Sequence, residues 1–279
     1  MNKVINDLIQ LQDLIQIQAQ HKTLKPRNHL SQLISSIEEM KANLPRSTRD
    51  LFEKLQKTTQ MAIVPIYNGA CTGCGMDLPI GQVNEVKMPT QLQQCPSCSR
   101  IVYMPPKDMP TMTGTTASKY GPRQTGIEKY TSRELMLPDL DADNAEEATE
   151  ALCGAMESAG FVQDCKQMVE IALERESVVS TAVDHGAAFP HARGIEGGGL
   201  TLAFGKSTKG FTFDSSAKEP THFVFFIAIP TAASAFYLKL LAGLTEALQS
   251  EANRKRLLKA DTPQKLMSAL LQSTRKTIK

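Results

Sequence analysis

The amino-acid sequence predicts an α/β protein whose C-terminal α/β sandwich, a mixed sheet flanked by helices, follows a helical hairpin and a small β-rich module. Three observations predict this class. The first part of the chain carries apolar residues at helical spacing, the next is rich in β-branched residues, glycines and paired cysteines, and the last alternates helical segments with two apolar runs. Helices that flank apolar strands indicate an α/β sandwich. At 279 residues the chain is long enough for two average domains.

Residues 1–61 predict a helical hairpin or short coiled coil. Val4, Leu8, Leu11 and Ile15 step by four, three and four residues, which is the spacing of a coiled-coil seam over about two heptads. A proline soon afterwards ends this helix, and two more amphipathic segments follow it. The seam permits a homodimer. An arm that only dimerises and an arm that binds another partner fit the sequence equally.

The composition divides the chain into four predicted parts. Residues 105–130 are rich in Pro, Gly, Thr and Ser and lack apolar periodicity, which predicts a flexible linker. The helical hairpin (1–61) and a cysteine-containing module (62–104) precede this linker, and the α/β domain (131–279) follows it.

Charge and hydropathy exclude several classes of protein. The net charge is +2, and residues 1–134 carry 16 Lys and Arg against 11 Asp and Glu, an excess too small and too dispersed to indicate nucleic-acid binding. No stretch approaches the roughly 20 apolar residues that span a bilayer. The first residues include Asn, Asp and Gln, unlike a secretory signal. We therefore predict a cytoplasmic protein with no membrane span, in which cysteines bind metal more readily than they form disulfides.

Four cysteines form two C-x-x-C pairs, Cys71 with Cys74 and Cys95 with Cys98, separated by 20 residues. A two-residue gap lets a tight turn direct both sulfurs at one ion, and the glycines beside the first pair relieve the backbone strain of such a turn. Four thiolates suit a closed tetrahedral Zn²⁺ site with no position for water, so we predict a structural zinc ion. A redox C-x-x-C would open a helix in a thioredoxin-like unit, and neither pair has that setting.

The segment from Cys71 to Tyr103 resembles the C4-type zinc-ribbon family that follows coiled-coil arms in bacterial proteins. The resemblance includes the second knuckle, CPSCSRIVY, although the coil here is much shorter than is usual in that family. It implies that the ribbon binds a protein or a nucleic acid, and we place a protein partner slightly ahead.

His191 lies in the segment that points most directly to chemistry. Pro190 fixes the backbone before it, and we expect the small residues nearby to leave its ring open to solvent and accessible to a large partner. A neutral imidazole is a competent nucleophile towards phosphorus. The guanidinium of Arg193, two residues away, can neutralise phosphoryl oxygens. No Walker-type loop occurs, so we do not expect direct use of ATP.

The C-terminal domain resembles enzyme IIA, type 2 (EIIA type 2), of the phosphoenolpyruvate-dependent sugar phosphotransferase system, the fructose, mannitol and nitrogen-related class. That family shows an R-E-x-x-x-S-T element, a G-x-A-x-P-H-x-R element, an apolar strand that ends in Pro, and a helix. Here these elements are Arg175-Glu176 with Ser180-Thr181, Gly186 to Arg193, FVFFIAIP, and YLKLLAGLTEAL, in the same order. The resemblance implies that His191 accepts a phosphoryl group from the phosphocarrier HPr and passes it to an EIIB component. Arg175 and Arg193 would then steady that group.

One position departs from the family pattern. Sugar-transporting members have a second histidine just before the leucine that begins the late helix, and Tyr237 stands at the matching position. Tyrosine can donate a hydrogen bond to phosphate but cannot act as an imidazole. Our leading interpretation is therefore a cytoplasmic phosphocarrier in a regulatory role. The alternative is a non-catalytic EIIA-like interaction protein whose ribbon binds protein or nucleic acid.

We predict mainly structural roles for the remaining histidines and cysteines. His185 fits a pocket-lining position and a surface loop equally, whereas His222 opens an apolar run and predicts a structural residue. Cys153 and Cys165 fall in predicted helices and read as buried apolar side chains rather than metal ligands.

Overall fold

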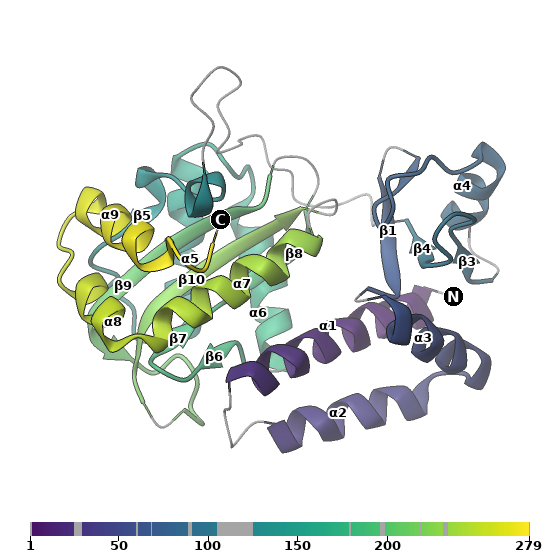
Figure 1. The fold of residues 1–279 in the computed structure, drawn as a ribbon, viewed down its shortest axis with the longest axis horizontal. Helices are drawn as coiled ribbons and strands as arrows, with labels where there is room; N and C mark the ends of the chain where they lie inside the picture. The colour runs from purple at the N-terminus through teal and green to yellow at the C-terminus, as the bar shows by residue number, and fades with distance from the viewer. Residues whose placement is uncertain are drawn as a thin grey trace. The chain divides into compact units, whose positions relative to one another are not determined.

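The chain forms two compact units, Met1–Lys107 and Asp108–Lys279, each with its own sheet and core (Figure 1). The structure is a computed structural model. It describes residues 2–24, 30–59, 61–67, 69–88, 91–104, 125–178, 180–195, 199–217, 219–230 and 234–278. Within these ranges no helix combines the length and the hydrophobicity needed to cross a membrane.

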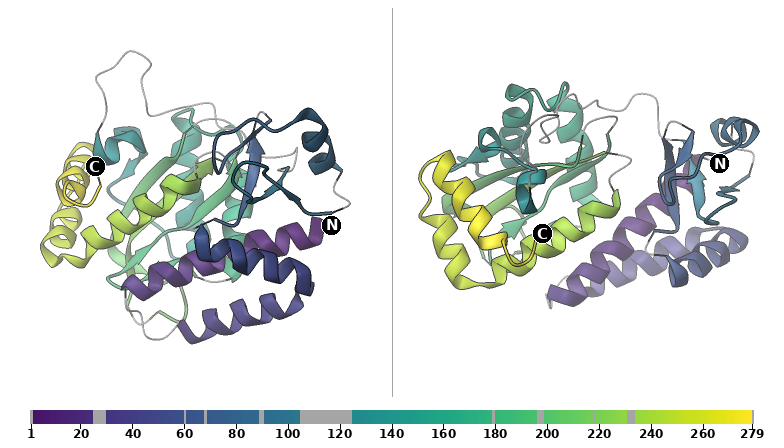
Figure 2. Two further views of the ribbon diagram at one scale, coloured as in Figure 1. Left: turned by 45° about the vertical axis from the view of Figure 1, so that its right-hand side comes forward. Right: turned by 45° about the horizontal axis from the view of Figure 1, so that its top comes forward.

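Three helices open the first unit: α1 (Asn2–Leu24), α2 (Leu30–Asn43) and α3 (Arg46–Thr58). Helices α1 and α2 lie side by side, which confirms the helical hairpin (Figures 1 and 2). Leu8 and Leu11 of the predicted seam are fully buried within the single chain. The predicted break at Pro26 lies outside the described residues.

The second part of this unit is a four-stranded sheet in the order β2-β1-β4-β3, with one short helix. Its elements are β1 (Ile63–Tyr67), β2 (Ala70–Cys71), α4 (Ile80–Lys87), β3 (Gln93–Gln94) and β4 (Ile101–Tyr103). The sequence prediction of a β-rich module did not include α4.

Gln12 joins the helices to this sheet. Its side-chain amide donates to the Ile63 carbonyl at 3.0 Å, and its Oε1 accepts from the Ile63 amide at 2.9 Å. Both backbone groups of a buried strand residue are thereby paired, which avoids the cost of leaving them unsatisfied. The hairpin and the ribbon therefore form one unit.

The second unit is built on a mixed sheet, as the sequence predicted, and this sheet has six strands in the described residues. The strand order is β5-β9-β10-β7-β6, and β8 also pairs with β10. Strand β10 runs antiparallel to β9 and parallel to β7 and β8. The strands are β5 (Met136–Leu137), β6 (Ala182–Val183), β7 (Ala187–Ala188), β8 (His191–Ile195), β9 (Thr201–Phe211) and β10 (Thr221–Pro230).

Helices cover both faces of this sheet (Figures 1 and 2). Alternate residues of β10 point to opposite faces. Val224 and Phe226 pack in the core under α5 and α6, whereas Phe225 and Ile227 pack in the core under α7, α8 and α9. A strand buried on both faces needs a continuous apolar sequence, and β10 has one. The helices are α5 (Ala145–Ser158), α6 (Cys165–Val178), α7 (Ser234–Gln249), α8 (Glu251–Leu258) and α9 (Pro263–Thr274).

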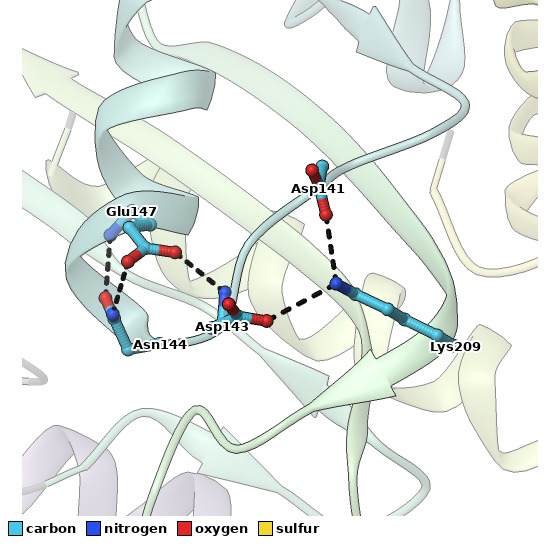
Figure 3. A network of polar contacts seen from close by, with 5 residues as sticks. All are labelled: Asp141, Asp143, Asn144, Glu147 and Lys209. Carbon is cyan, nitrogen blue, oxygen red and sulfur yellow. Dashed lines mark hydrogen bonds and ion pairs between the residues drawn. The ribbon is translucent and has the colours of Figure 1, made fainter.

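Helix α5 begins with a reciprocal cap (Figure 3). Asn144 Oδ1 accepts from the Glu147 amide at 2.9 Å, and Glu147 Oε2 accepts from the Asp143 amide at 2.8 Å. Lys209 of β9 contacts the carboxylates of Asp141 and Asp143 at 3.0 and 3.3 Å. These exposed ion pairs stabilise the fold little in water, but the cap fixes where the helix starts.

Most of the predicted linker, residues 105–124, lies outside the described residues. Its last residues are described, and they pack into the second unit as a short 3₁₀ helix, Gly126–Lys129. Ile127 is 1% exposed in the core beneath α7 and α9. The Tyr130 carbonyl accepts from the Leu202 amide at 2.6 Å. Our domain boundaries remain predictions.

Candidate functional site

His191 is the first residue of β8 and lies beside Ile227 of the central strand β10. Because side chains alternate along a strand, His191 and Arg193 share one face of β8 and Ala192 takes the other. Ala192 packs in the core under α5 and α6. The two polar residues therefore face the side of the sheet that carries α7.

A glycine turn sets the chain direction ahead of His191. Gly186 has φ of +66°, and a Cβ at that position would lie 2.7 Å from the Pro220 carbonyl oxygen. Its own carbonyl accepts from the amides of His222 and Phe223 at 2.8 and 3.0 Å. Glycine is the residue that tolerates both the positive φ and the close backbone approach. The glycine of the G-x-A-x-P-H-x-R element thus anchors β7 against β10.

The Phe189 carbonyl determines the tautomer of His191. Its oxygen lies 3.0 Å from His191 Nδ1. A carbonyl can only accept, so this hydrogen bond places the proton on Nδ1 and leaves the lone pair on Nε2. The Phe189 ring stacks on Phe225 with centroids 5.2 Å apart, which holds the carbonyl in place. The nucleophilic nitrogen of this ring is therefore Nε2.

Two arginines act on His191 through their charge. Burial lowers the pKa of His191 well below its ordinary value of 6.5, and the positive charges of Arg175 and Arg193 lower it further. The hydrogen bond to the Phe189 carbonyl opposes these effects. The imidazole is neutral at neutral pH as a result, which is the form that can attack phosphorus. The structure thus brings together the histidine and the two arginines that the sequence singled out.

The predicted solvent exposure of His191 is wrong. Its side chain is 2% exposed. The small residues around it, Ala187, Ala188 and Ala192, are themselves fully buried between the sheet and its helices. They are small because they pack in a dense core, and they do not open a path to the ring.

Tyr237 contributes to this burial. It lies in the first turns of α7, is 2% exposed, and places its hydroxyl 3.3 Å from His191 Nδ1. The two ring centroids are 5.0 Å apart. Tyr237 therefore contacts His191 directly.

Glu176 is a residue of this site whose role the sequence did not reveal. Its carboxylate accepts hydrogen bonds from both the backbone amide and the hydroxyl of Thr181. Burial raises the pKa of Glu176, and the bonds from Thr181 counteract that rise. The Thr181 carbonyl in turn accepts from the Phe189 amide at 3.3 Å. The signal was present in the R-E-x-x-x-S-T spacing, which brings the carboxylate of α6 back onto the following loop.

The four cysteines of the first unit form a compact cluster. Their sulfurs all lie within 4.8 Å of one another, and the Cys71–Cys98 and Cys74–Cys95 pairs are each 3.7 Å apart. A tetrahedron with Zn–S distances of about 2.3 Å has S–S edges of about 3.8 Å, so the donor set fits Zn²⁺. Burial would raise the pKa of Cys98, but hydrogen bonds from the Arg100 amide and guanidinium help bring it to about 7.

The two knuckles of this cluster have matching backbones. Gly75 and Ser99 each follow the second cysteine of a pair, and both have positive φ, 77° and 61°. The amides of these two residues donate to the carbonyls of Cys71 and Cys95 at 2.7 and 2.8 Å. Gly73 has a different reason to be glycine, because a Cβ there would lie 2.7 Å from the Arg100 side chain.

The remaining candidates lie apart from this chemistry. His185 is exposed in the turn before Gly186, with φ of +72°. His222 Nδ1 is 3.0 Å from the Ser207 carbonyl, a contact between β10 and β9. Cys153 is fully buried, and Cys165 is partly buried beside it.

Comparisons with known proteins agree with both halves of this description. A family model of the C4-type zinc ribbon domain matches residues 70–102. A family model of the phosphoenolpyruvate-dependent sugar phosphotransferase system, EIIA 2, matches residues 129–273. The fold and these matches define a phosphotransferase-system component that also carries a zinc ribbon.

The following individual relatives match the C-terminal half of the chain. It is 31% identical over 148 residues to the PTS system fructose-specific EIIA component of Haloferax volcanii, covering 53% of this chain and 96% of that protein. It is 29% identical over 145 residues to the nitrogen regulatory protein of Bradyrhizobium diazoefficiens, covering 52% and 94%. The crystal structure of nitrogen regulatory protein IIA-Ntr from Neisseria meningitidis matches at 21% identity and a TM-score of 0.44, covering 50% and 95%. The chain belongs to the EIIA type 2 family, and its homologues support a phosphocarrier role.

Proposed function

We propose that the C-terminal domain is a phosphocarrier that accepts a phosphoryl group from an HPr-like donor on Nε2 of His191, in a regulatory role in the cytoplasm. The observation that carries this proposal is the pairing of His191 Nδ1 with the Phe189 carbonyl, which leaves the Nε2 lone pair for attack. Membership of the EIIA type 2 family supports the same assignment.

In the proposed step, Nε2 forms a bond to phosphorus as the bond between phosphorus and the donor nitrogen breaks. The donor nitrogen recovers its lone pair, and His191 keeps its proton on Nδ1, so no proton has to leave the ring. Arg175 and Arg193 balance the negative charge that arrives with the phosphoryl oxygens. Before transfer, burial and then the same two charges lower the pKa of His191, which keeps the imidazole neutral.

The burial of His191 adds a requirement to this step. A ring with 2% exposure cannot meet a donor protein without a local opening, so docking of the donor has to be coupled to that opening. We expect phosphorylation to be slower than attack on an exposed histidine would be.

Incubation of the full chain with enzyme I, HPr and phosphoenolpyruvate tests the proposal. Wild type should gain one phosphoryl group, and His191→Gln should gain none. His185→Asn is the matched control, because His185 is exposed and asparagine also tolerates a positive φ. Labelling of His191→Gln at the wild-type level would overturn the proposal.

Burial of the ring and Tyr237 above it favour a second function, that of an EIIA-like regulator that binds partners without passing the group on. This candidate predicts little transfer from phosphorylated protein to an EIIB-type acceptor. Mixing the purified phosphoprotein with an EIIB domain and following label on each chain separates the two functions. Fast transfer of the phosphoryl group to the EIIB domain would rule out the second function.

For the first unit we infer a structural Zn²⁺ held by Cys71, Cys74, Cys95 and Cys98, and a protein as the partner of the ribbon. The four-sulfur geometry supports the ion. A nucleic-acid partner would instead show binding that weakens steeply as salt rises. Titrations of the full chain against DNA and RNA at two salt concentrations test that alternative.

A further inference from the structure

The two faces of the sheet in the second unit carry opposite charges. Helices α8 and α9, with the tail that follows them, lie on the face that also carries α7 (Figures 1 and 2). We call residues 251–278 the basic hairpin, because they contain 7 Lys and Arg against 2 Asp and Glu. On the opposite face, residues 139–178 include α5 and α6 and contain 11 Asp and Glu against 2 Lys and Arg. The sheet therefore separates a positive surface from a negative one.

Most cations of the basic hairpin are in excess of its own carboxylates. Glu251 pairs with Lys255 at 2.6 Å, and Asp261 pairs with Lys265 at 2.8 Å. The two acidic residues of the hairpin are thereby matched one to one with lysines. The cations left in excess are Arg254, Arg256, Lys259, Arg275 and Lys276. Arg254 is partly buried, and the other four are exposed.

Hydrogen bonds bring the cations of the two helices onto one surface. Arg256 Nη1 donates to Ser273 Oγ at 3.4 Å, and Asn253 Nδ2 donates to the Ser273 carbonyl at 3.4 Å. These bonds join α8 to the end of α9, where Arg275 and Lys276 follow. Arg256 Nη1 also donates to Asn253 Oδ1 at 2.7 Å. Neutral acceptors of this kind orient a guanidinium without neutralising its charge.

The basic hairpin lies beyond the end of α7 that is remote from His191. Tyr237, which contacts His191, is in the first turns of α7, and α8 begins 14 positions later at Glu251. At 1.5 Å per helical residue this separation is about 20 Å. Charges are screened over about 8 Å at physiological salt. The basic hairpin is therefore a surface distinct from the histidine site.

We propose that the basic hairpin is a docking surface for an acidic segment of a protein partner. Guanidinium groups bind carboxylates through two parallel hydrogen bonds, so Arg256 and Arg275 suit Asp and Glu side chains. Helix α9 has 12 residues and is about 18 Å long, which about six extended residues of a peptide would span. This surface goes beyond the proposed phosphocarrier function and does not depend on it.

Two other anionic partners fit this surface less well. Stable binding to a bilayer needs an apolar anchor besides a basic patch. The exposed large apolar side chains of the described residues all lie in the first unit: Ile34, Met76, Ile80 and Met88. A nucleic acid would extend past the hairpin over residues 125–250, where 18 Asp and Glu against 9 Lys and Arg would repel its phosphates. A short acidic segment meets neither obstacle.

Fluorescence anisotropy of a labelled Glu-rich peptide, titrated with the full chain at low and physiological salt, tests the proposal. Wild type should bind the peptide, more tightly at low salt. Lys259→Glu combined with Lys276→Glu should weaken binding about 10-fold or more, because it reverses two of the excess cations. Lys166→Glu combined with Lys209→Glu is the matched control. It makes the same change in net charge at two exposed lysines outside the hairpin and should bind as wild type does.

Failure of wild type to bind the peptide at low salt, or equal loss of binding in both double variants, would overturn the proposal. Duplex DNA and vesicles containing phosphatidylserine are titrated in parallel. If either binds tighter than the peptide and the hairpin variant loses that binding, the partner is not an acidic protein. Sedimentation of the chain alone should show no association that the hairpin variant abolishes, since such association would make a second copy the occupant. If the Lys259→Glu, Lys276→Glu variant does not fold, Arg275→Gln combined with Lys276→Gln replaces it.

Discussion

The cysteine cluster and the histidine site are assembled in different ways. Each knuckle of the cluster is a local turn, in which the two cysteines of a pair are three positions apart and the carbonyl of the first cysteine accepts from the amide of the residue after the second. The histidine site draws on α6, β8 and α7, with Arg175 and Tyr237 separated by 62 positions in the chain. We therefore expect the cysteine cluster to depend on the zinc ion proposed for it, and the histidine site to depend on the whole core of the second unit.

The largest effect is expected from the cysteine cluster. Cys95→Ser, or removal of zinc by a chelator, should abolish the folding transition of the first unit, because structural zinc binding supplies about 10 kcal/mol or more in small zinc modules. The transition of the second unit should persist. Calorimetry of the full chain, with zinc content measured in parallel, checks both statements.

Cys165→Ser is the matched control for this experiment, since Cys165 lies in α6 and belongs to the other unit. It should retain zinc and keep the first transition. If the chelator leaves both transitions unchanged, the ion does not hold the first unit together.

The second-largest effect is expected at the histidine site, where loss of the Glu176 carboxylate should lower the stability of the second unit. Glu176→Ala leaves the Thr181 amide and hydroxyl without their acceptor and should destabilise the second unit by about 2 kcal/mol. Glu176→Gln keeps one acceptor oxygen and should cost less. Hydrogen exchange of residues 181–190 measures the effect, because that segment carries the Thr181–Phe189 bond. Equal protection in wild type and Glu176→Ala would refute the supporting role.

A smaller effect follows from the pKa of His191. In the folded state this pKa lies well below the ordinary value of 6.5, so on acidification the unfolded chain takes up a proton that the native protein does not. Stability should therefore be constant above about pH 7 and fall below about pH 6.5, by up to about 1.4 kcal/mol per pH unit.

Urea denaturation of wild type and His191→Gln across this pH range isolates the contribution of His191, because the other titratable groups are shared. The glutamine variant should lose less stability on acidification. Parallel pH profiles for the two proteins would show that the His191 ring takes up a proton as easily when folded as when unfolded.

The smallest effect compares the two knuckles. Ser99 adopts the positive φ that Gly75 adopts at the equivalent position, and a non-glycine residue pays roughly 1 kcal/mol or more for it. Ser99→Gly removes that strain but raises the conformational entropy of the unfolded state. We therefore expect the free energy of unfolding to increase by about 0.5 kcal/mol. Gly75→Ala should have the opposite sign. Melting temperatures of the zinc-loaded protein measure both, and destabilisation by Ser99→Gly would show that its hydroxyl contributes more than its backbone strain costs.

The sequence predicted the features that local spacing or continuous hydrophobicity encodes. The paired cysteines and the apolar strand β10 are of this kind. Helices α4 and α8 were missed because each is only eight residues long. Strands β6 and β7 were missed because two-residue strands show no alternation.

The sequence predicted the residues of the histidine site, but it did not predict their burial or their contacts. The motif named His191 and its two arginines, and the fold brings their charges together. The small residues beside His191 do not predict how exposed its ring is, because small side chains occur in densely packed cores as well as around accessible sites. The contact with Tyr237 depends on how α7 packs on β8, which is a tertiary property.

Fragment mass spectrometry at neutral pH, after incubation of the full chain with enzyme I, HPr and phosphoenolpyruvate, tests the central claim most directly. Cleavage after Arg175 and Arg193 releases a peptide that contains both His185 and His191. We predict one phosphoryl group on His191 and none on His185. An unmodified peptide, or a phosphoryl group on His185, would contradict the account.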